Sequence, residues 1–258
     1  MNVRDTDGRR NFGHDDQVEA SLRQHFERFD ISPLEVAKNF PIYSRRSVLK
    51  KFLAHYMLFR ETISLPGDIV ELGVFRGTTL MGWANFLEIH NMGDRQKQVF
   101  GFDNFEGFQS FSDKDGASNL ANDKVVGGFN SSCFEEILED AIAIFDGDRF
   151  VSYKPRVKLV KGDICVTVPE FVANNPGLRI SLLHFDCDLY EPTMAALQSL
   201  WPLVVPGGIV LFDEYGIRPW EGESSAVDEF FRGKKEESCL QRFDWCPNPG
   251  AYCKKLGN

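Results

Sequence analysis

Apolar positions along the chain follow two different spacings, and their alternation predicts helices and strands in turn. In residues 45–63 the apolar side chains recur at helical spacing with Lys and Arg between them, which is typical of an amphipathic helix. Similar helical segments are expected at 80–90, 131–145, 191–204 and 224–233. Five shorter runs are almost wholly apolar, as buried strands are: 69–73, 99–103, 157–163, 180–186 and 207–214.

This order of strands and helices predicts an α/β fold, with a doubly wound, mostly parallel sheet that is covered on both faces. Two further runs, at 240–245 and 251–256, flank the turn CPNPG and predict a C-terminal antiparallel hairpin. With these two strands, the expected sheet has seven strands.

The length of 258 residues suits one such domain, which we place at 41–258. Residues 1–40 are expected to form an N-terminal extension that is partly flexible, because its beginning is polar. Residues 104–156 separate the second and third strands by more than an ordinary connection needs. We therefore expect an insertion there, with the helix 131–145 beside a flexible loop at 116–128. Long insertions of this kind are often lids.

Charge and composition disfavour several classes of protein. The formal net charge of −9 and the pI near 5.1 argue against nucleic acid as a partner, because nucleic-acid binders present a basic face. No apolar run approaches the roughly 20 residues of a membrane span, and the N-terminus lacks the pattern of a signal peptide. The six cysteines include no CxxC pair, which favours reduced packing residues. A cytoplasmic protein is expected.

Acidic residues stand at or near the carboxyl end of every predicted parallel strand. They are Glu71, Asp103, Asp163, Asp186, Asp188, Asp213 and Glu214. Any one of them, alone, is as well explained by a helix cap or a surface charge. Ligands of open α/β sheets bind at the carboxyl edge, and buried carboxylates usually meet a metal, a cation or a proton. Seven acids at one edge therefore predict a binding site.

The turn after the first strand reads ELGVFRGTT, with Gly73 and Gly77 at its corners. Glycine lets a ligand approach the backbone, and the amides of the following helix can hold an anion. Because residue 75 is Phe, the turn departs from the dinucleotide pattern GxGxxG, and NAD is disfavoured. Asp103 follows the next strand, where a carboxylate is placed to hold a ribose diol.

Five segments in this order, ELGVFRGTT, GFDNFEGF, FDCDLYEPT, PGGIVLFDEYG and AVDEFF, resemble the macrocin O-methyltransferase (TylF) family. That family includes the mycinamicin and novobiocin sugar methyltransferases, and the similarity covers roughly residues 40–258. The resemblance implies a Rossmann-like class I methyltransferase fold. It also implies S-adenosylmethionine (SAM) as methyl donor and Mg²⁺ bound to a hydroxyl pair of a sugar.

The resemblance also assigns roles to residues of this chain. Asp186, Asp213 and Glu214 would hold Mg²⁺, and Asp188 would be the general base. Where the family usually has Asp-Asp after the fifth strand, this chain has Asp213 and Glu214. A strict strand would turn Asp186 and Asp188 to the same face, so both would address one cavity. The residues expected to bind SAM are Glu71, Gly73, Val74, Gly77, Thr78, Asp103 and Asp163.

Other features of the sequence leave open the roles of single residues and the class of protein. His184 is interpreted as a core histidine, and Trp220 with Glu221 either walls the acceptor pocket or only packs a loop. D-x-D motifs also bind the metal of nucleotide sugars, so a metal-dependent glycosyltransferase is an alternative, although it does not explain ELGVFRG. A SAM-fold binding protein without catalysis is another. The acceptor is expected to be a sugar, glycoside or polysaccharide precursor, and a homo-oligomer is left open.

Overall fold

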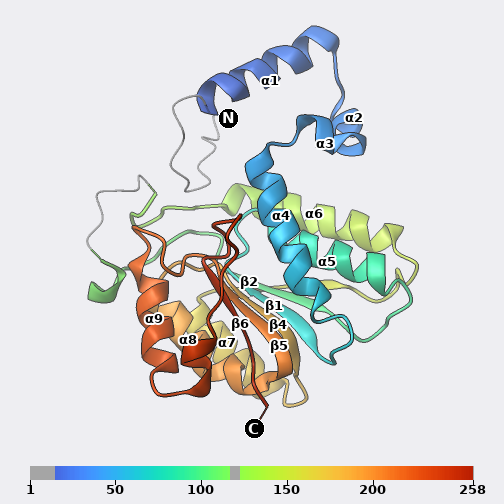
Figure 1. Ribbon diagram of the computed structural model, residues 1–258. Helices are drawn as coiled ribbons and strands as arrows, with labels where there is room; N and C mark the ends of the chain where they lie inside the picture. Colours follow the sequence, from blue (N-terminus) through green and yellow to red (C-terminus); the bar gives the residue numbers. More distant parts are fainter. Residues whose placement is uncertain (1–14, 117–122, 258) are drawn as a thin grey trace.

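The computed structural model describes residues 15–116 and 123–257, and one sheet runs through its centre (Figure 1). The described strands are β1 (Asp68–Leu72), β2 (Val99–Asp103), β3 (Val157–Lys161), β4 (Ile180–Phe185), β5 (Val204–Phe212) and β6 (Ala251–Lys254). Their order across the sheet is β3-β2-β1-β4-β5-β6. The strands from β3 to β5 are parallel, and β6 runs antiparallel to β5. The expected mostly parallel sheet with an antiparallel C-terminal pair is confirmed.

The expected count of seven strands is wrong, because the described residues form a sheet of six. From the first run of the expected hairpin only Gln241 pairs, in an isolated antiparallel bridge with Tyr252. The turn between the runs is held against the end of β5, where the Gly250 amide donates to the Asp213 carbonyl at 3.0 Å. Phe243 packs its ring on Tyr252, with 5.2 Å between centroids. Side-chain packing thus takes the place of the first strand of the expected hairpin.

Helices cover both faces of the sheet, as the doubly wound interpretation requires (Figure 1). On one face lie α4 (Arg46–Arg60), α5 (Thr78–His90) and α6 (Ser132–Asp148). On the other lie α7 (Ile164–Asn174), α8 (Tyr190–Leu200) and α9 (Glu221–Phe231). The short 3₁₀ helices are η1 (Asp113–Asp115), η2 (Trp201–Leu203) and η3 (Lys235–Cys239). All five predicted helices are therefore present, with their ends shifted by a few residues.

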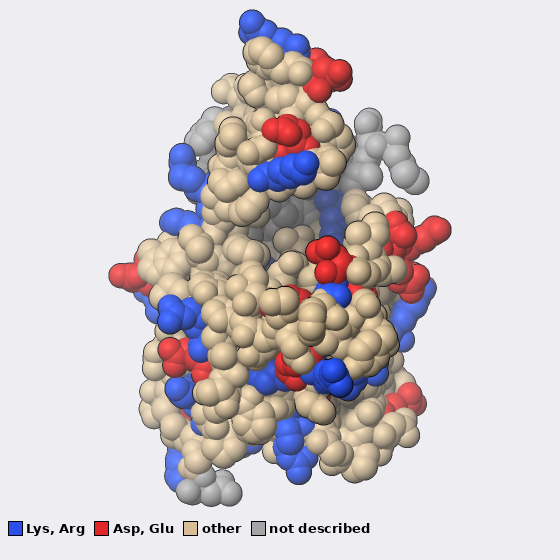
Figure 2. Space-filling view, turned by 90° about the vertical axis from the view of Figure 1, so that its right-hand side faces the viewer, with Lys and Arg blue, Asp and Glu red and all other residues tan. Residues whose placement is uncertain are grey.

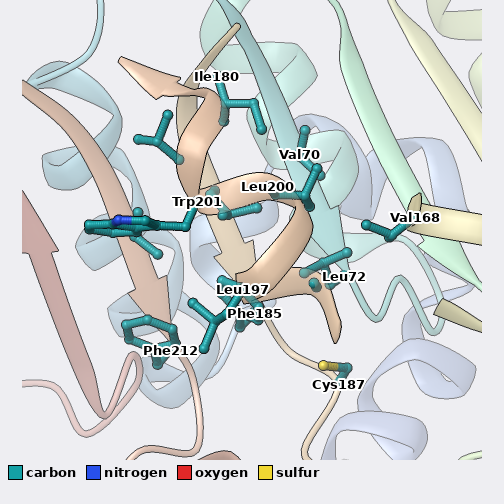
Figure 3. Close-up of a cluster of buried hydrophobic side chains, with 14 of the residues drawn as sticks. Val70, Leu72, Val168, Ile180, Phe185, Cys187, Leu197, Leu200, Trp201 and Phe212 are labelled. Atoms are coloured by element: carbon teal, nitrogen blue, oxygen red, sulfur yellow. The ribbon is translucent and has the colours of Figure 1, made fainter. Parts of the chain in front are cut away.

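Each face of the sheet has its own buried core, because successive side chains of a strand point to opposite faces. Val70 and Leu72 of β1 pack with Leu197 of α8 in the core that Figure 3 shows. Ile69 of β1 belongs to the core on the opposite face, under α4 and α5. Glu71 shares the parity of Ile69, so a carboxylate is placed beneath these two helices.

Sequence reasoning missed α7, whose β-branched residues and internal Pro169 lower its helix propensity. Two features outweigh that propensity. The Asp163 carboxylate accepts a hydrogen bond from the Cys165 amide at 2.8 Å and so caps the helix N-terminus. The chain must also cross back before it can begin another parallel strand, and such crossovers are usually helical. Val168 of α7 is fully buried in the core.

The N-terminal segment is helical where it is described. α1 (Asp15–Phe29), α2 (Pro33–Lys38) and α3 (Phe40–Tyr43) precede α4, and α1 projects from the body of the molecule (Figures 1 and 2). Residues 1–14 and 117–122, which belong to the segments expected to be flexible, lie outside the described residues. Basic and acidic side chains are interspersed over the face in Figure 2. Among the described helices, none is long and apolar enough to cross a membrane.

Candidate active site

A cavity of about 1540 Å³ opens at the carboxyl ends of the parallel strands. The strand order changes direction between β1 and its neighbour β4, and ligands of open α/β sheets bind at such a switch. Most of the residues that the sequence singled out line this cavity: Glu71, Gly73, Val74, Thr78, Asp103, Asp163, Asp186, Asp188 and Glu214. Two of the expected residues, Gly77 and Asp213, are not among its lining residues.

The turn after β1 has backbone conformations that glycine adopts readily. Gly73 has φ 89°, and a Cβ atom there would lie 1.9 Å from the Asp186 carbonyl oxygen. Gly73 therefore lets the end of β1 approach the loop after β4. Phe75 also has a positive φ, 51°, although it carries a side chain. Backbone strain of this kind persists where the surroundings hold it, and it concentrates at functional sites.

Asp103 holds this turn in place. Its Oδ2 accepts hydrogen bonds from the amides of Val74 and Phe75, each at 2.7 Å, and its Oδ1 accepts one from the Phe105 amide. The carboxylate at the end of β2 thus fixes the loop that follows β1. It also lines the cavity, as does Asp163 at the N-terminus of α7.

Three carboxylates gather on the cavity side of the loops after β4 and β5. One oxygen from each of Asp186, Asp188 and Glu214 lies within 4.8 Å of the others. β4 ends at Phe185, so strand alternation is not what brings the two aspartates together. Asp188 has φ 64°, and this left-handed residue turns the chain just beyond the strand. The backbone of a tight turn therefore builds the acid pair.

The cluster raises the pKa values of its own members. Burial raises the pKa of the Asp188 carboxyl well above its usual range, and the charges of Glu214 and Asp186 add to this. Burial likewise raises the pKa of Asp186, with Asp213 contributing. Neighbouring carboxylates repel one another unless a cation lies among them. Three carboxylates facing a cavity fit the oxygen ligands that Mg²⁺ prefers.

Asp213 is turned away from these three, toward the sheet and α4. Its Oδ1 lies 3.2 Å from Nε2 of His184 and 3.6 Å from Nε2 of His55. Its Oδ2 forms an ion pair with Nζ of Lys51. Burial by itself would raise the pKa of Asp213, but Lys51 and the two histidines outweigh burial and lower that pKa well below its usual range.

A row of buried polar side chains continues from Asp213 across the sheet. His184 of β4 pairs in register with Glu71 of β1, and its Nδ1 lies 3.2 Å from the Glu71 carboxylate. The same carboxylate accepts a hydrogen bond from Nε1 of Trp83 at 2.7 Å. Burial disfavours a charged imidazole, but Asp213 and Glu71 outweigh it and raise the pKa of His184 to about 10. His184 is thus a buried, hydrogen-bonded residue beneath the site.

Aromatic rings form one wall of the cavity. Phe75, Phe108, Phe129 and Trp220 are in contact, with ring centroids 5.5 to 5.8 Å apart. Phe108 and Phe129 come from the insertion, and Trp220 comes from the loop after β5. Nζ of the buried Lys124 contacts the carbonyl oxygens of Asp115 and Pro219, so it ties the insertion to that loop.

Sequence analysis missed Lys51, His55 and the wall residues Phe108 and Phe129. A signal existed for the first two, because they are four residues apart on a helix and share a face with the buried Leu58. Polar residues at helical spacing on an apolar face indicate a buried partner. No comparable signal marks Phe108 or Phe129, since their places depend on how the insertion packs.

Comparison with known proteins gives matches over nearly the whole chain. The family model Macrocin-O-methyltransferase (TylF) matches residues 17–255. The 8-demethyl-8-(2,3-dimethoxy-α-L-rhamnosyl)-tetracenomycin-C 4′-O-methyltransferase of Streptomyces olivaceus is 30% identical over 192 residues, which are 73% of this chain and 69% of that protein.

Two solved structures of CalS11 also match. One, described as a calicheamicin methyltransferase, has a TM-score of 0.86 at 28% identity, over 95% of this chain and 94% of that one. The other is an apo structure, described as a TDP-rhamnose 3′-O-methyltransferase, with a TM-score of 0.78 at 27% identity. It covers 95% of this chain and 96% of its own.

Proposed function

Because the chain belongs to the macrocin O-methyltransferase (TylF) family, we propose that it transfers the methyl group of SAM to a sugar hydroxyl, with Mg²⁺ at the carboxylate cluster. One observation carries the proposal. The carboxylates of Asp186, Asp188 and Glu214 converge beside a glycine turn, in a cavity at the switch point of the sheet. Methyl transfer needs a donor site and an acceptor site that meet in one cavity, and this arrangement supports the proposal because it leaves room for both.

The donor site in this proposal is the turn from β1 to α5 and the strand ends beside it. The residues that would form this site are Glu71, Gly73, Val74, Gly77, Thr78, Asp103 and Asp163. The close backbone approach at Gly73 and the amides held by Asp103 support it. A preformed turn costs little reorganisation when ligand binds. Glu71 would act from beneath the turn, since its side chain is 1% exposed.

In this proposal the metal ligands and the general base are the residues to which the family resemblance assigns these roles. Asp186 and Glu214 of the cluster would hold Mg²⁺ together with Asp213, whose Oδ2 Lys51 links to Asp186, and Asp188 would accept the proton of the acceptor hydroxyl. When bound, Mg²⁺ lowers the pKa of a hydroxyl that it ligates. Burial raises the pKa of Asp188, which makes its carboxylate a stronger base than an exposed one. The positive charge of bound Mg²⁺ would favour its ionised form, so that it could accept the proton.

The acceptor side is the part of the cavity beneath the aromatic wall. Apolar faces of sugar rings pack well on aromatic side chains, and the polar groups of the cluster are left to bind hydroxyls. The tetracenomycin relative acts on a rhamnosyl compound, and CalS11 is described with TDP-rhamnose. We therefore propose a deoxysugar acceptor, either as a nucleotide sugar or as a glycoside, and we place the reaction in the cytoplasm.

Labelled methyl transfer tests this function. The purified protein, with Mg²⁺ and SAM carrying a tritiated methyl group, is incubated with TDP-rhamnose and, separately, with a rhamnosyl glycoside. We expect label to appear in at least one acceptor. Binding of SAM without transfer to either would instead favour a binding protein that lacks catalysis. Binding of nucleotide sugar with no affinity for SAM would favour a glycosyltransferase.

A further inference from the structure

Lys51 of α4 lies at the side of the carboxylate cluster that faces Asp213, and it stands outside the five segments that resemble the family. Its Nζ is 3.1 Å from Oδ2 of Asp186 and also contacts Oδ2 of Asp213. The Lys51 side chain is 21% exposed, whereas that of Asp213 is fully buried. One ammonium group therefore bridges the two aspartates that follow β4 and β5.

The charge of Lys51 is well supported at this position. Lysine carries a positive charge at neutral pH unless it is buried without a partner, and here its Nζ contacts one oxygen of each of two carboxylates. His55, which lies on the same face of α4, approaches Asp213 at the other oxygen, Oδ1. The ammonium of Lys51 is thus the cation that balances this pair of carboxylates from the α4 side.

A divalent ion held by both Asp186 and Asp213 would need Oδ2 of Asp213, the oxygen that Lys51 now contacts. The ammonium and the ion would compete for the same lone pairs, and at such short range they would also repel each other. The second oxygen of Asp213 offers no substitute, because it faces His184 and His55. Both cations cannot occupy this place together.

We propose that Lys51 is a tethered cation that fills the place between Asp186 and Asp213, so that a divalent ion binds both carboxylates only after Lys51 withdraws. This inference rests on the metal site of the proposed function. Withdrawal has a route, because the Lys51 side chain already lines the cavity together with Ser44 and Val48. The displaced ammonium would then lie on the acceptor side, above the carboxylates.

Metal binding by the metal-free protein tests the competition without any measurement of activity. Mn²⁺ serves as the probe, since it takes the same oxygen ligands as Mg²⁺ and its free concentration can be followed by electron paramagnetic resonance. Two variants remove the charge: Lys51→Met, and Lys51→Gln, which keeps hydrogen-bond donors for Asp213. The matched control is Lys50→Met, which removes an exposed lysine from the same helix.

We expect Lys51→Met and Lys51→Gln to bind Mn²⁺ about tenfold more tightly or better, and Lys50→Met to bind it as the wild type does. Thermal unfolding and SAM affinity check that each variant is folded. Unchanged or weaker Mn²⁺ binding in folded Lys51→Gln would overturn the inference, as would no binding by any variant. The two proposals can fail separately. If the wild type transfers methyl groups but the Lys51 variants bind Mn²⁺ no more tightly than it does, the proposed function is supported and the competition between Lys51 and the metal is refuted.

Discussion

Asp188 is held in a left-handed backbone conformation within the acid cluster, and burial raises its pKa. If it is the general base, Asp188→Asn should retain SAM affinity and lower the rate of methyl transfer by about 10²–10⁴. Single-turnover rates and calorimetry with SAM measure the two quantities.

Mn²⁺ affinity distinguishes the base from a metal ligand at the same position. The oxygens of Asp186 and Asp188 lie within 4.8 Å of each other, so both are near enough to share one ion. If Asp188 is the general base and Asp186 a metal ligand, Asp186→Asn should lose much of its Mn²⁺ affinity and Asp188→Asn should lose little. Equal losses in the two variants would make Asp188 a ligand, and the proton would then have to leave to water.

Glu214 is the residue at which this chain departs from the usual acid pair of the family. Its carboxylate nevertheless faces Asp186 and Asp188, so the longer side chain still reaches the cluster. We expect Glu214→Asp to keep at least about half of the wild-type transfer rate and to bind Mn²⁺ as tightly or more tightly. Glu214→Ala is the contrasting variant, and it should lose metal affinity. A severe loss in Glu214→Asp would show that the site has adapted to the longer side chain.

At the scale of elements, the turn from β1 to α5 depends on the close approach at Gly73. A Cβ atom there would meet backbone of the loop after β4, and the φ of 89° is unfavourable for other residues. Gly73→Ala should therefore lower the melting temperature and abolish SAM binding. Gly147→Ala is the matched control, because α6 leaves open space around Gly147. Equal behaviour of the two variants would contradict the importance of this contact.

The polar row across β1, β4 and β5 makes stability depend on pH. The folded protein raises the pKa of His184 to about 10, from about 6.5 when unfolded, so the stabilising contribution is complete below pH 6.5 and is lost as pH rises through 10. The titratable groups that face this imidazole are Glu71 from β1, Asp213 just after β5 and His55 from α4.

Replacing His184 tests that dependence. At pH 7, His184→Gln should be less stable than the wild type by about 3–5 kcal/mol, because it leaves buried carboxylates without their cation. The gap should narrow toward pH 10 as the wild type loses its proton. Chemical unfolding at both pH values measures the difference. A gap that stays constant with pH would mean that His184 is neutral in the folded protein.

At the scale of the whole molecule, the sequence predicted the structural features that are determined by short stretches of chain. The five parallel strands were found because each is a local apolar run, and their acids were found because they stand at strand ends. α7 was missed because its cap and its place in the crossover outweigh a poor local propensity. The prediction of a seventh strand was wrong because the turn at Gly250 is held against the end of β5 and does not close a hairpin.

The sequence predicted that the acidic residues lie at one edge of the sheet, but not the directions of their side chains. Asp186, Asp188 and Glu214 converge at that edge, whereas Asp213, which the resemblance placed among the metal ligands, points elsewhere. The direction of Asp213 depends on Lys51 and His55, which arrive from a helix distant in the sequence. Packing of α4 on the sheet decides that contact. The spacing of Lys51 and His55 indicates a buried partner, but only the fold shows that the partner is Asp213.

Transfer of a labelled methyl group from SAM to TDP-rhamnose, measured with Mg²⁺ and again in excess EDTA, tests the central claim most directly. SAM affinity is measured by calorimetry under both conditions. In the proposed function the carboxylate cluster belongs to the acceptor side of the cavity, so chelation should abolish transfer, leave SAM affinity nearly unchanged, and be reversed by added Mg²⁺. Full turnover in excess EDTA would contradict metal-assisted methyl transfer at this site.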